Sequence, residues 1–173
     1  MRKIILGSVI VVGVLFTSLL VIGIIRKIQD HKLITEKIAR FPAFCFMTLS
    51  NESFNSTEIK KGPVLVVHFH PECEHCQYEI SEILKSNIPT LFSSVILISS
   101  AHPDSIIRFL NRLNYSDYAS VIPLVDTSYN FESIFGSGIV PSSYIYNKRL
   151  NLVKILHGEV KTETIIKCLQ ESE

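Results

Sequence analysis

The feature that most constrains this chain is an uncharged, apolar run near its beginning. The run from Ile4 to Ile25 spans 22 residues without one charged side chain, and basic pairs flank it at positions 2–3 and 26–27. As a helix rising about 1.5 Å per residue, a run of this length crosses a hydrocarbon core of roughly 30 Å. A cleaved signal peptide has a shorter apolar region of about 7–15 residues and a small-residue exit site, and this run has neither. We therefore predict an uncleaved transmembrane anchor over residues 1–25, with residues 4–25 in contact with the lipid bilayer.

Residues 26–40 follow the anchor and contain neither glycine nor proline. Apolar residues recur here at roughly helical spacing, which predicts a juxtamembrane helical linker. The linker ends at Phe41-Pro42, since the residue before a proline avoids the helical region. The segment carries five basic residues against two acidic ones. Taken alone, the positive-inside rule would keep the rest of the chain in the cytoplasm, although long domains are translocated largely regardless of charge.

Residues 41–173 are numerous enough to form one domain with its own hydrophobic core. The formal net charge of the whole chain is +1, from 17 Lys+Arg and 16 Asp+Glu. This balance excludes the strong basic excess typical of nucleic-acid binders, so no nucleic-acid partner is expected. The Gly-Ser-Gly triplet at 136–138 lacks the strand and helix that flank a phosphate-binding loop.

Apolar runs and their periodicity predict that strands alternate with helices in this domain. The expected strands cover residues 44–49, 64–69, 95–98, 121–125, 144–146 and 152–156. Helical spacing covers residues 76–87, 106–113 and 162–169, and a helical turn is expected at 131–135. The continuous apolar run at 64–69 is typical of a strand buried on both faces. The alternation, closed by a hairpin and a helix, predicts an α/β fold with a mixed sheet.

Two of the four cysteines, Cys73 and Cys76, lie close together where the strand at 64–69 leads into a helix. The thiolate is the reactive form of cysteine, and free backbone N–H groups at a helix N-terminus stabilise its negative charge. Two intervening residues let Cys76 reach back over one helical turn and resolve a mixed disulfide formed at Cys73. A bare C-x-x-C also occurs in zinc sites, but its position between a buried strand and a helix favours redox chemistry.

Together with Val140-Pro141 directly ahead of a strand, this pair carries a resemblance to a known family. From about Phe44 onward, over about 130 of 173 residues, the chain resembles the membrane-anchored thioredoxin-like proteins of bacteria, which include redoxins and the cytochrome-c-maturation thiol reductases. The matching stretches are VLVVHFHPECEHCQYEI and VPSSYIYNKRLNLVKILHGEV. The resemblance implies a thioredoxin-like fold, with a central mixed sheet flanked by helices and an N-terminal strand pair. It also implies an extra strand–helix insertion in the roughly 65-residue gap between Cys76 and Pro141.

The same resemblance implies roles for individual residues. Cys73 would be the attacking thiol and Cys76 the resolving thiol. Pro141 would be a cis proline whose loop packs against the cysteines and receives the partner's backbone, and an ordinary trans proline at the start of a strand is the alternative. Glu79 would exchange protons with the thiols, and a solvated helix residue is the alternative. The implied activity is that of a thiol–disulfide oxidoreductase without a cofactor, which acts on client proteins with thiols or disulfides and exchanges electrons with a membrane partner.

Residues around Cys73 bear on the direction of electron flow. Glu72 stands where the family usually has tryptophan, and the chain contains no tryptophan. His75 is similar to the active turn of strongly oxidising members, whereas Glu74 is similar to the cytochrome-maturation reductases. A protonated His75 favours the thiolate of the active pair, and the carboxylates of Glu72, Glu74 and Glu79 oppose it. Because three carboxylates outweigh one half-titrated imidazole, we expect a reductant.

Two other functions stay open at this point. The potential metal ligands within nine residues are His68, His70, Cys73, His75 and Cys76. Thiolate and imidazole ligands suit copper, so a copper-binding thioredoxin-like module is one alternative, although a histidine in the predicted strand is more typical of a buried structural residue. A thioredoxin-like peroxidase is the other, but it requires a threonine and an arginine near the nucleophile, and the segment HPECEHC has neither.

The remaining cysteines, Cys45 and Cys168, lie in different terminal elements, where they form either a structural disulfide or two buried free thiols. The redox pair and the family resemblance favour a single-pass protein of the bacterial inner membrane with its domain in the periplasm, where thiols and disulfides interconvert. The basic residues of segment 26–40 argue against this orientation, but the rule they follow is weak for long domains.

Overall fold

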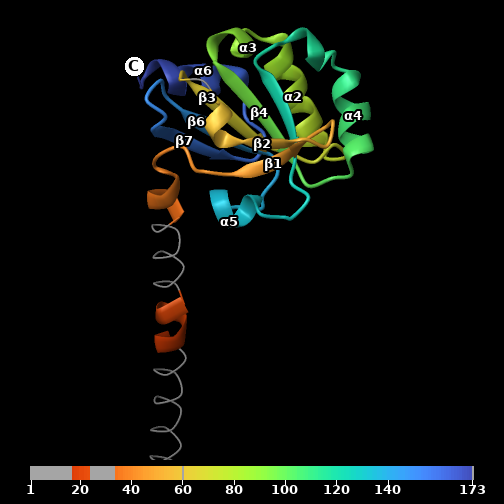
Figure 1. Ribbon diagram of the computed structural model, residues 1–173. Helices are drawn as coiled ribbons and strands as arrows, with labels where there is room; N and C mark the ends of the chain where they lie inside the picture. Colours follow the sequence, from red (N-terminus) through yellow and green to blue (C-terminus); the bar gives the residue numbers. More distant parts are fainter. Residues whose placement is uncertain (1–16, 24–33, 60, 173) are drawn as a thin grey trace, which may run out of the picture. The chain divides into compact units, whose positions relative to one another are not determined.

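The computed structural model describes residues 17–23, 34–59 and 61–172 (Figure 1). Contacts divide the chain into two units, Met1–Glu36 and Lys37–Glu173. Residues 17–23 and 34–38 are helical. Most of the anchor predicted over residues 1–25 and about half of the linker predicted over 26–40 lie outside the described residues. Within the described ranges, no helix is both long enough and apolar enough to cross a membrane.

The described part of the second unit contains one seven-stranded mixed sheet, with the strand order β2-β1-β5-β4-β3-β6-β7. Its strands are β1 (Cys45–Thr48), β2 (Ser53–Asn55), β3 (Val64–His68), β4 (Ser94–Ser99), β5 (Val121–Val125), β6 (Ser142–Tyr146) and β7 (Leu152–His157). The central strands β3, β4 and β5 are parallel. At one edge β1 is antiparallel to both β5 and β2, and at the other β6 and β7 continue antiparallel from β3. The predicted mixed sheet and the N-terminal strand pair are therefore confirmed.

Helices connect the strands at the predicted places. They are α2 (Glu74–Lys85), α3 (Ile88–Leu91), α4 (Pro103–Asn111), α5 (Phe131–Phe135) and α6 (Thr162–Gln170), with short 3-10 turns at Ser56–Glu58 and Tyr115–Asp117. The sequence did not predict α3, because a four-residue helix is too short to show periodicity. Between α2 and Pro141 the chain forms α3, β4, α4, β5 and α5.

One face of the sheet carries the main apolar core. Successive residues of a strand point to opposite faces, and β3 is buried over its whole length. Leu65 and Val67 of β3 belong to one cluster with Ile80 of α2, Ile106 of α4 and Ile165 of α6. Three helices therefore cover this face, and burial of their apolar stripes against the strands fixes the position of α2 and its N-terminus.

The opposite face is packed with aromatic rings. His68 of β3 stacks on Phe131 of α5, with ring centroids 4.0 Å apart. Tyr144 of β6 packs edge-on against the same phenylalanine at 5.8 Å. Phe41 packs edge-on against Tyr146 at 4.9 Å. In Figure 1, α5 lies across the sheet from α2 and α4. This face therefore has a thinner cover than the helical face, formed by one short helix and the segment before β1.

Local hydrogen bonds hold α5 in place. Both carboxylate oxygens of Asp126, which directly follows β5, accept backbone N–H groups at the start of the helix, from Asn130 at 3.0 Å and from Phe131 at 2.8 Å. The helix ends at Gly136, whose φ of 84° lies in the left-handed region that glycine adopts without strain. Asp126 is 1% exposed, so its charge depends on these N–H donors for compensation.

Candidate active site

Cys73 is the residue immediately before α2, where the chain leaves β3. Its backbone is extended, with φ −83° and ψ 118°. Its carbonyl accepts the first helical hydrogen bond from Gln77 at 2.9 Å, and its own N–H donates to the carbonyl of His70 at 3.1 Å. Its side chain is partly exposed. The first thiol is thus accessible and lies at the N-terminus of α2.

Cys76, in the first turn of α2, is fully buried. The backbone N–H of His70 lies 3.5 Å from its Sγ. Burial is the main reason that the pKa of the Cys76 thiol rises from 9.0 to about 12. The hydrogen bond and charge of Cys73 and the charge of Glu79 also raise this pKa, whereas the hydrogen bond from the His70 N–H lowers it. The second thiol is therefore protonated at neutral pH and shielded from large reactants. This asymmetry gives the two cysteines different chemistry.

Glu79 lies one turn further along α2 and is completely buried. Its Oε1 accepts the hydroxyl of Ser143 in β6 at 2.7 Å, and its Oε2 accepts the backbone N–H of Val160 at 3.0 Å. Burial raises the pKa of this carboxyl group, and the two hydrogen bonds act against the rise. The alternative of a solvated helix residue is therefore wrong. Glu79 is a buried acid held in one orientation close enough to Cys76 to act on its pKa.

His75, between the two cysteines, points to a carboxylate on another element. Its Nδ1 lies 2.7 Å from Oε2 of Glu159, which precedes Val160 in the connection between β7 and α6. The side chains are 73% and 37% exposed, so the pair adds little to stability. The pair instead places a carboxylate beside the imidazole of the active turn, which the sequence did not predict.

Pro141 follows a cis peptide bond, as predicted, and is buried at the start of β6. Its carbonyl accepts the N–H of Gly158 at 2.9 Å, which joins this loop to the connection between β7 and α6. Val140, the preceding residue, packs against the main core, and so does Cys73. The elements that carry the five predicted site residues therefore meet at one end of the sheet.

Comparisons with known proteins support this geometry at the level of the fold. No protein-family model matches the sequence, and no curated protein matches it. A secreted Mycobacterium tuberculosis disulfide oxidoreductase, described as homologous to E. coli DsbE, is similar with a TM-score of 0.61 and 14% identity, over 77% of this chain and 96% of that one. The exposed lipoprotein thioredoxin Etrx1 of Streptococcus pneumoniae is similar with a TM-score of 0.56 and 22% identity, over 75% and 98%. The peroxidoxin BcpB of Mycobacterium tuberculosis is similar with a TM-score of 0.62 and 12% identity, over 78% of this chain and 96% of that one.

The fold is thioredoxin-like. At these identities the similarity establishes the architecture, and the chemistry of the chain rests on its own residues. Within the thioredoxin-like domain, a C-x-x-C pair begins the first helix of the parallel β3–α2–β4 unit, with a cis proline at the start of β6.

Three groups in the site were not predicted from the sequence: Ser143, Glu159 and the backbone N–H of Val160. One signal pointed to the first of them. The segment Ser142–Tyr146 begins with two serines and is buried throughout, and buried hydroxyl groups need partners. Nothing in the sequence pointed to Glu159 or Val160, because they lie in a connection more than 80 positions after α2 begins.

The other histidines and cysteines of the thioredoxin-like domain have separate surroundings. His70 accepts the N–H of Glu72 at 3.3 Å. Within the described residues, no group of three or more His, Cys, Asp or Glu side chains is placed to hold a metal ion. Cys45 and Cys168 are both free, so the disulfide considered for them is not formed. Cys45 is exposed and Cys168 is partly exposed, so neither is the buried thiol that was considered.

Proposed function

We propose that the chain is a thiol–disulfide oxidoreductase that exchanges disulfides with client proteins through Cys73 and Cys76. The observation that carries the proposal is the asymmetry of the pair on a thioredoxin-like fold. Cys73 is partly exposed at the N-terminus of α2. Cys76 is fully buried, and its pKa is raised to about 12. An accessible nucleophile beside a protected second thiol is the arrangement that disulfide exchange requires.

The reaction runs in two thiol–disulfide exchanges. The Cys73 thiolate attacks one sulfur of a client disulfide, a mixed disulfide forms, and the other client sulfur leaves as a thiolate. Cys76 loses its proton and attacks the Cys73 sulfur, so the second client thiolate leaves and the pair becomes a disulfide. Glu79 is the acceptor for the Cys76 proton, because it is buried near that thiol and its own pKa is raised.

Trapping of the mixed disulfide tests this assignment. Replacement of Cys76 by Ser removes the resolving thiol, so Cys73 should accumulate covalent adducts with clients that reducing agents release. Replacement of Cys73 by Ser should give no adducts, because the buried second thiol does not reach a client. Adducts in the Cys73→Ser variant and none in the Cys76→Ser variant would reverse the two roles.

The direction of electron flow that we propose is reduction of the client. Glu79 places a buried carboxylate near the pair, and Glu72 and Glu74 lie in the exposed active turn. Glu159 stands 2.7 Å from His75, so a further carboxylate lies beside the active turn. Less stable thiolates mean a less stable reduced form and a more reducing pair. The reduction potential should lie nearer to about −270 mV than to about −120 mV, and a value above about −150 mV would favour an oxidase.

We also propose that residues 4–25 anchor the chain in a bacterial inner membrane with the domain in the periplasm. The support is the uncharged run of 22 residues and the persistence of client disulfides in an oxidising compartment. A reductant in that compartment requires an electron donor, and a membrane protein that passes electrons across the bilayer is the partner we propose. A membrane-impermeant thiol reagent should label Cys73 in intact spheroplasts of cells that express a Cys45→Ser variant. Labelling after lysis alone would place the domain in the cytoplasm.

A further inference from the structure

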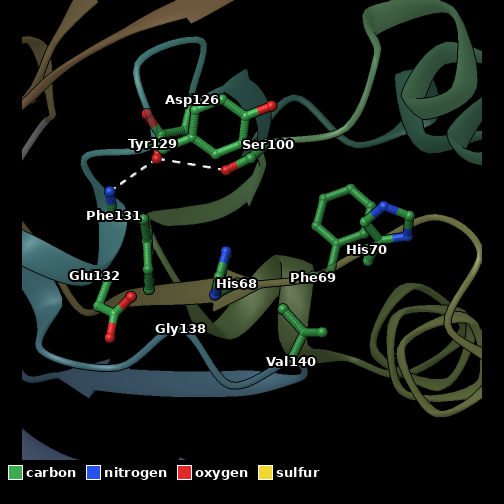
Figure 2. A pocket seen from close by; sticks show the side chains of 10 residues that line it. All are labelled: His68, Phe69, His70, Ser100, Asp126, Tyr129, Phe131, Glu132, Gly138 and Val140. Carbon is green, nitrogen blue, oxygen red and sulfur yellow. Dashed lines mark hydrogen bonds between the residues drawn. The ribbon is translucent and has the colours of Figure 1, made fainter.

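A cavity of about 330 Å³ lies beside the dithiol (Figure 2). It is bounded by the carboxyl ends of β3, β4 and β5, by α5 and by the loop that leads to Pro141. Two of its lining residues connect it to the reactive pair. His70 donates its N–H toward Sγ of Cys76, and Val140 immediately precedes Pro141. Its volume is in the range of sites that enclose a small ligand or one large side chain.

The cavity contains one polar atom whose hydrogen bonding is incomplete. Figure 2 shows the imidazole of His68 in the middle of the lining residues. The residue is 8% exposed, and its Nδ1 is buried without a hydrogen-bond partner among the described residues. The backbone of Ile139 raises the pKa of the ring, as a carbonyl that accepts a ring N–H does. Because Nδ1 has no partner in the described part of the chain, the proton is assigned to the other ring nitrogen, Nε2. A neutral imidazole has one donor nitrogen and one acceptor nitrogen, so Nδ1 is an acceptor to which no described group donates.

The other polar groups of the cavity are already engaged or lie at its rim. The two oxygens of Asp126 accept N–H groups of α5, and Ser100 donates to one of them at 3.5 Å. The walls beside His68 are formed by Phe69, Phe131 and Val140. The exposed carboxylate of Glu132 also lines the cavity. The interior beside His68 thus combines apolar and aromatic walls with one buried acceptor that has no donor among the described residues, and this combination suits an aromatic group that carries a hydrogen-bond donor.

Exposed apolar residues mark the side from which the cavity is entered. Tyr129, which lines it, is 76% exposed, and Ile139, next to Val140, is 55% exposed. Large apolar side chains that stay exposed around a cavity are typical of a binding surface. Burial lowers the pKa of His68 to about 4, in spite of the nearby Asp126, so its imidazole is uncharged at neutral pH.

We propose that this cavity binds a tyrosine or tryptophan side chain of the client, close in sequence to the client's reacting cysteine, and that its O–H or N–H donates to Nδ1 of His68. The inference rests on the proposed function and adds to it a class of client. Contact with the apolar and aromatic walls holds the ring, and the free acceptor selects rings with a donor over phenylalanine. The aromatic side chain thereby positions the client sulfur for attack by Cys73.

Peptides with one cysteine test the proposal on the full-length chain, reduced and carrying Cys45→Ser and Cys168→Ser. Each peptide is supplied as its mixed disulfide with thionitrobenzoate, and it carries Tyr, Trp, Phe, Lys or Ala one or two positions from the cysteine, on either side. Cys73 attacks the peptide sulfur and releases coloured thionitrobenzoate, and Cys76 then displaces the peptide thiol, so the protein dithiol is oxidised as the reagent is reduced. The rate constant is read at limiting peptide concentration.

At the best position we expect the Tyr peptide to react about fivefold faster than the Phe peptide, which corresponds to one neutral hydrogen bond. A His68→Phe variant keeps a ring to stack on Phe131 and removes the acceptor, so its Tyr-to-Phe ratio should fall to about one. A Ser100→Leu variant fills the cavity from the residue that follows β4 and should abolish the advantage of both aromatic peptides over Ala. The matched control is His102→Phe, an exposed histidine outside the cavity, which should keep the native ratio.

The outcomes separate this inference from the proposed function. Equal rates for the Tyr, Phe and Ala peptides, all through Cys73, would overturn the aromatic site and leave the oxidoreductase standing. Fastest reaction of the Lys peptide would overturn it in favour of a cation site. An unchanged Tyr-to-Phe ratio in the His68→Phe variant would show that Nδ1 is not the acceptor. Failure of every peptide, including Ala, to release thionitrobenzoate would overturn the proposed function itself.

Discussion

Replacement of Glu79 by Gln tests whether the buried carboxylate controls the resolving thiol. Glu79 and Cys76 are three residues apart on α2, a spacing that puts Cβ atoms about 5–6 Å apart. At about 6 Å and an effective dielectric constant of about 20, one negative charge disfavours another by about 2.8 kcal/mol, or about two pH units. This is an upper bound, because burial is the largest cause of the rise from 9.0 to about 12 and Glu79 the smallest. We therefore expect the Cys76 pKa to fall by about one pH unit.

The assay is a titration of thiolate absorbance in a chain in which Cys76 is the one remaining thiol, with serine in place of the other three cysteines. Loss of Cys73 removes two causes of the raised pKa, so the midpoint should lie below the native value. Glu82→Gln is the matched control, because Glu82 lies on the same helix but is partly exposed and bonded to Lys85 at 3.2 Å. An unchanged midpoint in Glu79→Gln, or an equal fall in Glu82→Gln, would refute the reasoning.

The rate of the second exchange separates proton transfer from simple electrostatics. Proton transfer to a general base accelerates a reaction by about 10²–10⁴-fold. Lowering the thiol pKa by one unit raises the rate only roughly threefold, because the nucleophilicity of a thiolate falls with its pKa. Glu79→Gln should therefore slow decay of a preformed mixed disulfide at neutral pH by about tenfold or more, as measured by acid quench. Faster decay in this variant would limit Glu79 to an electrostatic role.

Three further predictions concern stability, each measured by urea unfolding. Gly62→Ala should lower the free energy of unfolding by about 1–3 kcal/mol, because φ is 146° and an added Cβ would lie 2.6 Å from Cβ of Ser93. A change near zero would mean that the loop moves freely. Asp126→Ala should cost about 2 kcal/mol by removing both acceptors at the start of α5, and Asp126→Asn should recover part of it. Burial lowers the pKa of His68 from 6.5 to about 4. As pH falls, the unfolded chain therefore binds this proton before the folded chain does. The free energy of unfolding should fall by up to about 3 kcal/mol between pH 6.5 and 4, and the His68→Phe variant should not show this fall.

Much of the domain could be predicted from local sequence signals. The run at 64–69 is a strand buried along its length, because parallel central strands have both faces covered. The helix after Cys73 and the hairpin around residues 147–151 also follow from periodicity and turn residues. The cis bond before Pro141 was predicted through the family resemblance rather than from the residues themselves. In contrast, the order of the strands in the sheet depends on pairings between distant segments, which periodicity does not encode.

The sequence by itself determined the elements, the place of Cys73 and Cys76 at the start of a helix, and the uncharged run at 4–25, because each depends on residues adjacent in the chain. Only the tertiary structure decided the state of Glu79. Its helical position left burial and exposure equally open, and its two hydrogen bonds come from residues 64 and 81 positions away. Burial of His68 follows from the buried strand that the sequence predicts, but the tertiary structure decided that its Nδ1 lies beside a cavity, without a partner among the described residues, because α5, the ends of β4 and β5 and the loop before Pro141 meet there only when the sheet is assembled. Local chemistry set the reactive pair, and long-range packing set the electrostatic and binding environment around it.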